Sequence, residues 1–173
     1  YTLGPAGKET DVTGTLYDNG LLVIQGSGPM GDYRGFPSPS SPLHDDCADI
    51  KTVIIESGVE TVGANVFYEC TNFASITIPD GVMSIGESAF DTCTVLESIT
   101  IPASVAELGA YAFWGCVSLT SITIPEGVNS IGASAFEGCT SLTTVIFAGE
   151  STITTLPPYT FWDCWFLTSV NIP

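Results

Sequence analysis

The six cysteines are the most regularly spaced reactive side chains in the sequence. They are Cys47, Cys70, Cys93, Cys116, Cys139 and Cys164, separated by 23, 23, 23, 23 and 25 residues. Thiols placed in this way could form disulfides, bind a metal or pack as small apolar groups. An even number of cysteines in an exported protein favours disulfides. Stacked neighbours would have Cα atoms ~4.4–6.8 Å apart, a distance that a disulfide can bridge.

Free, buried thiols are nevertheless the interpretation that this pattern favours. Cysteines at one position of a repeat would point in parallel directions within a packed column, where a thiol behaves as a small hydrophobic side chain. The sequence has no C-x-x-C motif, and its one histidine, His44, is the only histidine near the column, so a zinc site is not supported. Bridged pairs stay open as the alternative.

His44 lies beside Asp45, Asp46 and Asp49, a group that resembles a metal or acid–base cluster. In the register of the cysteines, however, His44 takes the place of a core phenylalanine, and the aspartates are suited to cap a short helical turn. A Ser-His-Asp site also needs an oriented base and an oxyanion hole, and the sequence indicates neither. We therefore predict no catalytic residue, no metal ligand and no cofactor, and a protein that is not an enzyme.

The charge balance restricts the classes of partner. The chain has 19 acidic and 3 basic residues, for a formal net charge of −16. Such a surface repels the phosphates of nucleic acids and the headgroups of anionic lipids. No run of 18 apolar residues is present, so we expect no membrane insertion. The low content of charged residues favours an exported protein, and we expect that a leader has been removed and that the array continues after "SVNIP".

The elements that position these side chains form a 23-residue repeat. One unit reads "LTSITIPEGVNSIGASAFEGCTS" (119–141). Its first residues alternate between apolar and polar, as in a strand with one buried face, and Pro125 ends that strand. "EGV" predicts a turn, Ile131 returns to the core, Gly132 permits a tight bend or a positive φ, and "ASAF" predicts one helical turn.

A single unit cannot bury its apolar face, whereas stacked units bury it against one another. The repeat therefore predicts a right-handed solenoid with a parallel β-sheet on its concave side and short helical turns or irregular coil opposite. The fifth unit is two residues longer, so we expect a bulge after its strand, Leu156 in the place of Ile131, and a turn stiffened by Pro157 and Pro158.

The first 46 residues do not repeat. "TGTLYDNGLLVIQGSG" (13–28) predicts a β-hairpin around Asp18–Asn19–Gly20, and "GFPSPSSP" (35–42) predicts a Pro/Ser loop. We divide the chain into an N-terminal hairpin cap with this loop (1–46) and an array of about five 23-residue units and a fraction (47–173).

The unit "SITIPxGVxSIGxSAFxGC" resembles the repeat of the BspA-like leucine-rich repeat proteins. The resemblance covers residues 50–173, and "GTLYDNGLLVIQGSGPMGDY" is similar to the hairpin that often precedes such arrays. It implies a secreted or surface-attached bacterial protein that is not an enzyme and whose curved sheet binds proteins or cells. Fold transfers through such a resemblance better than function does.

The side chains that alternate with the buried strand residues are the candidate binding surface. If the isoleucines point inward, their neighbours point outward and form a field of hydroxyl groups. The candidate residues are Ser75, Thr77, Ser98, Thr100, Ser121, Thr123, Thr144 and Ile146. An exposed sheet also needs small polar residues for purely structural reasons. Trp114 and Trp162 are expected on the outer side, and exposed tryptophans are frequent at binding hot spots.

These observations favour a non-enzymatic recognition or adhesion module, secreted or on the cell surface. It would bind a protein or glycan of host or neighbouring cells through the concave sheet face. The alternative is a structural spacer that projects another domain from the cell. The sequence leaves the oligomeric state open.

Overall fold

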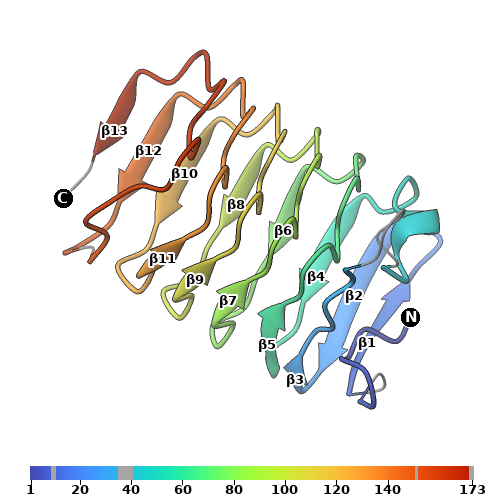
Figure 1. Ribbon diagram of the computed structural model, residues 1–173. Coiled ribbons are helices and arrows are strands. Elements are labelled where there is room, and N and C mark those ends of the chain that lie inside the picture. Colours follow the sequence, from blue (N-terminus) through green and yellow to red (C-terminus); the bar gives the residue numbers. More distant parts are fainter. Residues whose placement is uncertain (9–10, 35–40, 151, 172–173) are drawn as a thin grey trace.

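The computed structural model describes residues 1–8, 11–34, 41–150 and 152–171. The chain winds into a parallel-strand β-solenoid whose coils follow one another in sequence order (Figure 1). Among the described residues the only helix is the short 3₁₀ turn η1 (His44–Asp46). The predicted class, a repeat solenoid with one strand row along one side, is confirmed.

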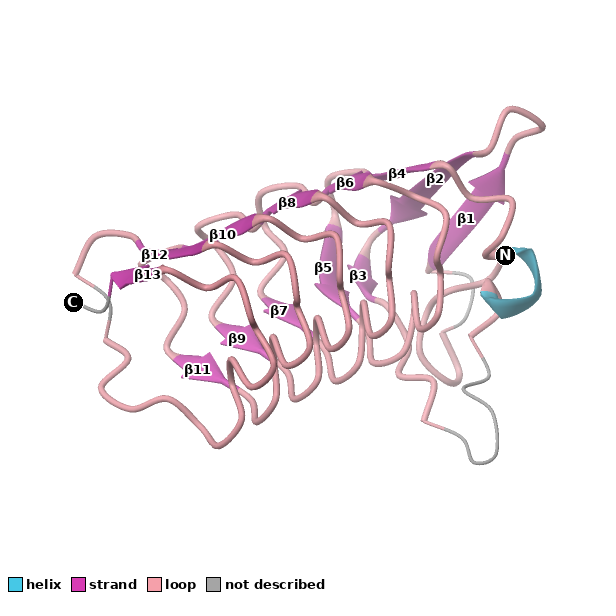
Figure 2. Cartoon of the chain, turned by 90° about the horizontal axis from the view of Figure 1, so that it is seen from above, coloured by secondary structure: helices cyan, strands magenta, loops and turns pink. Residues whose placement is uncertain are grey.

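The strands that were expected from the alternating pattern lie side by side in one row, which we call the principal sheet (Figure 2). Its strands pair in parallel except β1 with β2, which are antiparallel. The hydrogen-bonded strands form two groups, β1-β2-β4-β6-β8 and β10-β12-β13, which follow one another along the row. The row consists of β1 (Val12–Leu16), β2 (Leu21–Gly26), β4 (Thr52–Ile55), β6 (Ser75–Thr77), β8 (Ser98–Thr100), β10 (Ser121–Ile124), β12 (Thr144–Phe147) and β13 (Ser169–Asn171).

A second parallel sheet runs along another side of the solenoid (Figure 2). It consists of β3 (Gly28–Pro29), β5 (Val59–Val62), β7 (Ser84–Ile85), β9 (Glu107–Leu108) and β11 (Ser130–Ile131), in that order. The sequence analysis treated this part of the unit as a turn and a return to the core. Most of these strands are only two residues long, so they leave no detectable periodicity.

The fifth unit contributes no strand to the second sheet, because its described residues 152–157 are irregular. The two extra residues fall after β12, as expected, although residue 151 lies outside the described residues. Leu156 packs against the core but is only partly buried, and Ile153 is buried beside it. Proline does not disturb the next turn, because Ser134 N–H still donates to the carbonyl oxygen of Pro158 (3.1 Å).

The third side of each coil consists of two tight turns, so the prediction of a helical turn at "ASAF" is wrong. Ser88, Tyr111 and Ser134 have φ of 50°, 58° and 57°, in the left-handed region, which interrupts a right-handed helix. Alternate amides there donate to the next coil instead. Phe90 N–H, for example, donates to Ala112 O (2.9 Å). These bonds form a further ladder along the solenoid, which offsets the cost of the unusual backbone conformation.

The core consists of columns of identical side chains. The rings of Phe67, Phe90, Phe113, Phe136 and Phe161 stack with centroids 5.3–5.6 Å apart and interplanar angles of 1–16°. The strand isoleucines and the cysteines form parallel columns beside them, within one continuous core. Each fully buried large apolar side chain contributes ~1.5–3 kcal/mol to folding, so the repeated columns account for the cohesion of the coils.

Glycines form another column, but not for the reason that the sequence suggested. Gly63, Gly86, Gly109 and Gly132 do not have positive φ. A Cβ on Gly86 would instead lie 2.6 Å from the amide nitrogen of Ala64 in the preceding coil. Only glycine allows two coils to approach this closely.

The N-terminal hairpin is formed by β1 and β2, as predicted, and it joins the solenoid directly. β2 pairs in parallel with β4, and Val12, Leu22 and Ile24 are buried in the common core. The boundary between cap (1–46) and array (47–173) stays a prediction from the sequence. The Pro/Ser loop predicted for 35–42 lies largely outside the described residues, which lack 35–40.

Candidate functional site

The outer face of the principal sheet brings the predicted binding residues together. The alternation sends the strand isoleucines inward: Ile76, Ile99 and Ile122 are buried. Their neighbours point outward, and seven of the eight candidates are exposed, while Thr144 is half-buried. The register places Ser75 beside Ser98 and Thr77 beside Thr100, so hydroxyl groups of neighbouring coils lie in rows. We call this surface the hydroxyl face; it consists of Ser75, Thr77, Ser98, Thr100, Ser121, Thr123, Thr144 and Ile146.

The hydroxyls of this face are available to a ligand. In the part of the chain that the structure describes, no side-chain hydrogen bond involves the six serines and threonines of β6, β8 and β10. Hydroxyls next to the strands behave differently: Thr143 Oγ1 donates to Thr120 O (3.0 Å) and Thr168 Oγ1 to Thr143 O (3.1 Å). Those two hydroxyls form hydrogen bonds between neighbouring coils, whereas the described hydroxyls of β6, β8 and β10 form none.

Apolar side chains border the hydroxyl face at two coils. Ile54 on β4 is 38% exposed and Ile146 on β12 is 43% exposed. Ile146 lies beside Thr123 in the strand register. The outward side chains of β6, β8 and β10 carry no charge. The surface therefore offers hydrogen-bond donors and acceptors between two exposed isoleucines.

The cysteine column contains both outcomes that the spacing left open. Cys47 and Cys70 form a disulfide with Cα atoms 4.6 Å apart. Cys93, Cys116, Cys139 and Cys164 are free thiols. Burial raises the pKa of Cys93, Cys116 and Cys139 well above the ordinary value, and it raises the pKa of the half-buried Cys164 to about 11. Because only thiolates are good nucleophiles, burial lowers the reactivity of these cysteines at neutral pH.

The free thiols have a structural role that the sequence analysis missed. Each Sγ–H donates to the carbonyl oxygen of the phenylalanine in the preceding coil, as from Cys93 to Phe67 and from Cys116 to Phe90, at 3.1 Å in every case. The constant Phe-x-x-Cys spacing in five units was the available signal. The same carbonyl also accepts the amide N–H of the cysteine in its own unit, as from Cys70 to Phe67 (3.1 Å), so the thiol adds a second hydrogen bond that joins neighbouring coils.

The His44 cluster does not form a site. Asp45 and Asp46 do not cap η1, because its N-cap residue is Leu43 and no side chain bonds to the free amides there. Asp46 Oδ2 instead accepts a hydrogen bond from the Tyr1 hydroxyl (2.6 Å). Burial and this bond raise the pKa of Tyr1 to about 12. No group of three or more His, Cys, Asp or Glu side chains in the described ranges is arranged to hold a metal ion.

The tryptophans lie at the surface. Trp114 and Trp162 are exposed at the turns of the third side, as predicted, and Trp165 is 75% exposed. Trp162 packs edge-on against Tyr159 with centroids 5.7 Å apart. Trp165 Nε1 donates to Asp163 Oδ1 (3.3 Å). None of the three lies on the strands of the hydroxyl face.

Comparison with known protein families identifies the repeats of the array. Residues 41–173 match six copies of the BspA type leucine rich repeat region. The chain belongs to this family. The match includes every cysteine-containing unit, and it confirms the resemblance that the repeated "SITIP" units indicate. No curated protein matches the sequence significantly.

The solved structures similar to this BspA-type chain include two bacterial proteins that are named leucine-rich repeat proteins. A leucine-rich repeat protein from Bacteroides ovatus is 27% identical, with a TM-score of 0.71, over 94% of this chain and 46% of that protein. The Treponema pallidum leucine-rich repeat protein is 24% identical, with a TM-score of 0.67, over 97% and 81%. The pneumococcal vaccine antigen PcpA is 19% identical, with a TM-score of 0.68, over 94% and 37%. The chain thus spans about half of the Bacteroides protein.

None of the helices in the described part of the chain is long and apolar enough to cross a membrane.

Proposed function

We propose that this chain is a non-enzymatic recognition or adhesion module, secreted or on the bacterial surface, that binds a protein or glycoconjugate of host or neighbouring cells through the hydroxyl face. The observation that carries the proposal is the ordered field of exposed hydroxyls on β6, β8 and β10 that the fold itself does not use.

The chemistry of the face suits adaptable polar recognition. A serine or threonine hydroxyl both donates and accepts a hydrogen bond, so neighbouring rows match the amides of a protein or the hydroxyls of a sugar. Short side chains held on a rigid sheet lose little conformational freedom on binding. No charge has to be desolvated on the middle strands, and Ile54 and Ile146 provide apolar contacts at the borders.

The family supports a surface location. One of the similar structures is named a leucine rich cell surface protein, from Faecalibacterium prausnitzii, and PcpA is named a vaccine antigen. These names apply to those proteins, and their low identity to this chain supports only a common fold. The net charge of −16 adds that anionic polymers and lipids are poor partners.

The proposal is tested with a glycan and matrix-protein binding array and two variants. Thr100→Arg/Thr123→Arg places two long cationic side chains on the hydroxyl face, whereas Thr154→Arg/Thr155→Arg places the same change on exposed residues outside it. We expect the first variant to lose at least 10-fold in affinity for the partner that the array identifies, and the second to bind like the wild type. Circular dichroism checks that both remain folded.

Equal binding by both variants would place the site elsewhere. A wild-type chain that binds no protein or glycan on the array would favour the structural spacer instead.

A further inference from the structure

A groove on a different side of the solenoid has the properties of a second binding site. It lies over the second sheet and has a volume of about 970 Å³. Thr61, Ser84 and Glu107, which occupy adjacent rungs of the sheet, form one side. The N-terminal residues Gly4, Pro5 and Ala6 also line it. We call this surface the glycine groove.

Glycines leave part of the floor of the groove without side chains. Gly63, Gly86 and Gly109 line it, and a Cβ on any of them would collide with the backbone of the coil before it. The fold therefore requires a bare backbone here, independently of any ligand. A ligand main chain can approach such a floor more closely than it could approach a surface covered with side chains.

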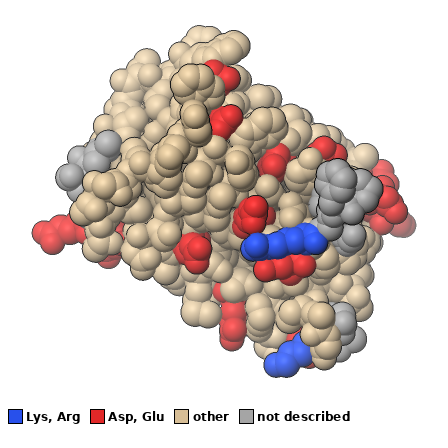
Figure 3. Space-filling view, viewed as in Figure 1, with Lys and Arg blue, Asp and Glu red and all other residues tan. Residues whose placement is uncertain are grey.

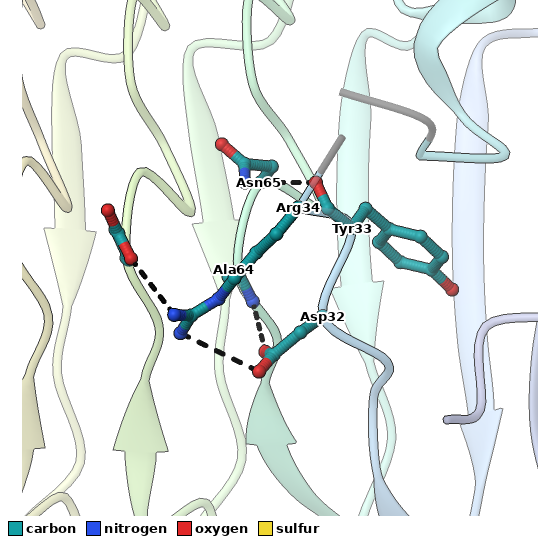
Figure 4. A network of polar contacts seen from close by, with 6 residues as sticks. Asp32, Tyr33, Arg34, Ala64 and Asn65 are labelled. Atoms are coloured by element: carbon teal, nitrogen blue, oxygen red, sulfur yellow. Dashed lines mark hydrogen bonds and ion pairs between the residues drawn. The ribbon is translucent and has the colours of Figure 1, made fainter. Parts of the chain in front are cut away.

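The protein's own segment after β3 forms one wall of the groove. An extended segment containing Asp32, Tyr33 and Arg34 lies along the coil of β5 (Figure 4). Tyr33 N–H donates to Ala64 O (2.9 Å), and Ala64 N–H donates to Asp32 Oδ1 (2.8 Å). Asn65 Nδ2 donates to Tyr33 O (2.9 Å). One main-chain hydrogen bond and two hydrogen bonds that involve a side chain thus join this segment to the coil of β5.

A cationic side chain already crosses the groove. The Arg34 guanidinium lies 3.7 Å from Asp32 Oδ2 and 3.2 Å from Glu87 Oε2, one coil beyond Ala64. The three side chains are 60%, 56% and 44% exposed. Exposed ion pairs contribute only ~0–1 kcal/mol, so Arg34 can be displaced or joined by another cation at little cost.

Glu107 is the carboxylate that Arg34 leaves without a charge partner. It is exposed on β9, pairs in register with Ser84 and lies in the lining of the groove. No ion pair in the described residues involves it. Figure 3 shows that acidic side chains outnumber basic ones on this side of the molecule, in keeping with the net charge of −16. The electrostatic complement of this surface is a basic partner.

We propose that the glycine groove binds an extended basic segment of a partner protein, with its main chain over the glycines and an arginine or lysine side chain paired with Glu107. This site is distinct from the hydroxyl face, since it lies on the other sheet and selects by charge instead of by hydroxyl hydrogen bonds.

Fluorescence anisotropy with a labelled (Gly-Arg)₅ amide tests the proposal on the whole chain, with (Gly-Glu)₅ amide as the acidic probe. We expect the basic peptide to bind and the acidic one not to. Glu107→Gln should weaken binding at least fivefold and Glu107→Arg more than 20-fold. Glu137→Gln removes the same charge from a turn on the third side, outside the groove, and should change binding by less than twofold.

A second measurement locates the peptide. In ¹⁵N-resolved NMR spectra we expect its addition to shift the amides of Gly63, Gly86 and Gly109, and to leave those of Ser98 and Thr100 unchanged. Thr100→Arg/Thr123→Arg should bind the peptide no more weakly than the wild type, which separates this site from the hydroxyl face.

Three results would overturn the proposal. Equal losses in Glu107→Gln and Glu137→Gln would show non-specific attraction to an acidic surface. Absence of (Gly-Arg)₅ binding would remove the site. Binding of an uncharged oligosaccharide, maltoheptaose, that is lost in Glu107→Gln while the peptide fails to bind would identify a sugar site instead.

Discussion

At the N-terminal end of the solenoid the β1–β2 hairpin lies over the core, whereas at the C-terminal end the last described coil has no such cover. Leu3, Leu22 and Ile24 are fully buried near the hairpin. In the coil that ends with β13, Phe161 and Cys164 are only half-buried, although their counterparts Phe113 and Cys116 are fully buried. The residue types are the same, so burial in this fold depends on having a neighbouring coil on both sides.

The phenylalanine column provides the largest test of that comparison. Phe113→Ala leaves a cavity between two coils and should lower the free energy of unfolding by about 3–5 kcal/mol. Phe161→Ala removes a ring that has a stacking partner on one side, so we expect about half of that loss. Urea denaturation followed by circular dichroism measures both. Equal losses would show that the end coil is as well packed as the middle.

The disulfide provides the next largest effect, at the covered end. Cys47 and Cys70 close a loop with a sequence separation of 23 residues, and a crosslink of this size stabilises a fold by ~3 kcal/mol. Cys70→Ser should therefore lower the stability of the oxidised protein by about this amount. In the presence of a reductant, the difference between the wild type and the variant should be much smaller, because the crosslink is then absent from both. A difference that does not respond to the reductant would argue against the bridge.

The smallest effect concerns reactivity rather than stability. With a pKa of about 11 against an ordinary value of 9.0, Cys164 has about 100-fold less thiolate near neutral pH than an ordinary thiol. Alkylation by iodoacetamide should therefore be slow at pH 7.5 and rise about 10-fold per pH unit towards pH 10. Cys93, at 0% exposure, should stay unmodified while the protein is folded. Mass spectrometry of labelled peptides distinguishes the two, and equal labelling would contradict the difference in burial between a middle coil and the last described coil.

The sequence was sufficient to predict the columns and the principal sheet, because both depend on strict spacing. The alternation in "SITIP" placed Ile99 inside and Ser98 outside, and the 23-residue interval aligned them with Ile76 and Ser75. The same alternation predicted which side chains make up the hydroxyl face.

The features that were missed depend on contacts between coils that leave no local pattern. The pair Ser84–Ile85 is too short to show the period of a strand, and Tyr111 adopts a left-handed conformation that its residue type does not suggest. Gly132 was assigned to a tight bend or a positive φ because its real constraint, the backbone of the preceding coil, is 22 residues away in the sequence. Arg34 was noted only as one of three bases, and its reach to Glu87 could not be foreseen without the fold.

Because each coil repeats the same side-chain positions, the repeat also restricts how the length of such a chain can change. Removal of residues 97–119, one complete unit, would bring Leu96 into the position of Leu119, Cys93 beside Cys139 and Phe90 beside Phe136, so every column would close again with the same partner. Insertion of a unit would be accommodated in the same way. Deletion of a part of a unit would misalign the columns unless a loop absorbs the difference, as the loop after β12 absorbs the two extra residues of the fifth unit. The reach of this protein can therefore vary only in whole steps of one coil.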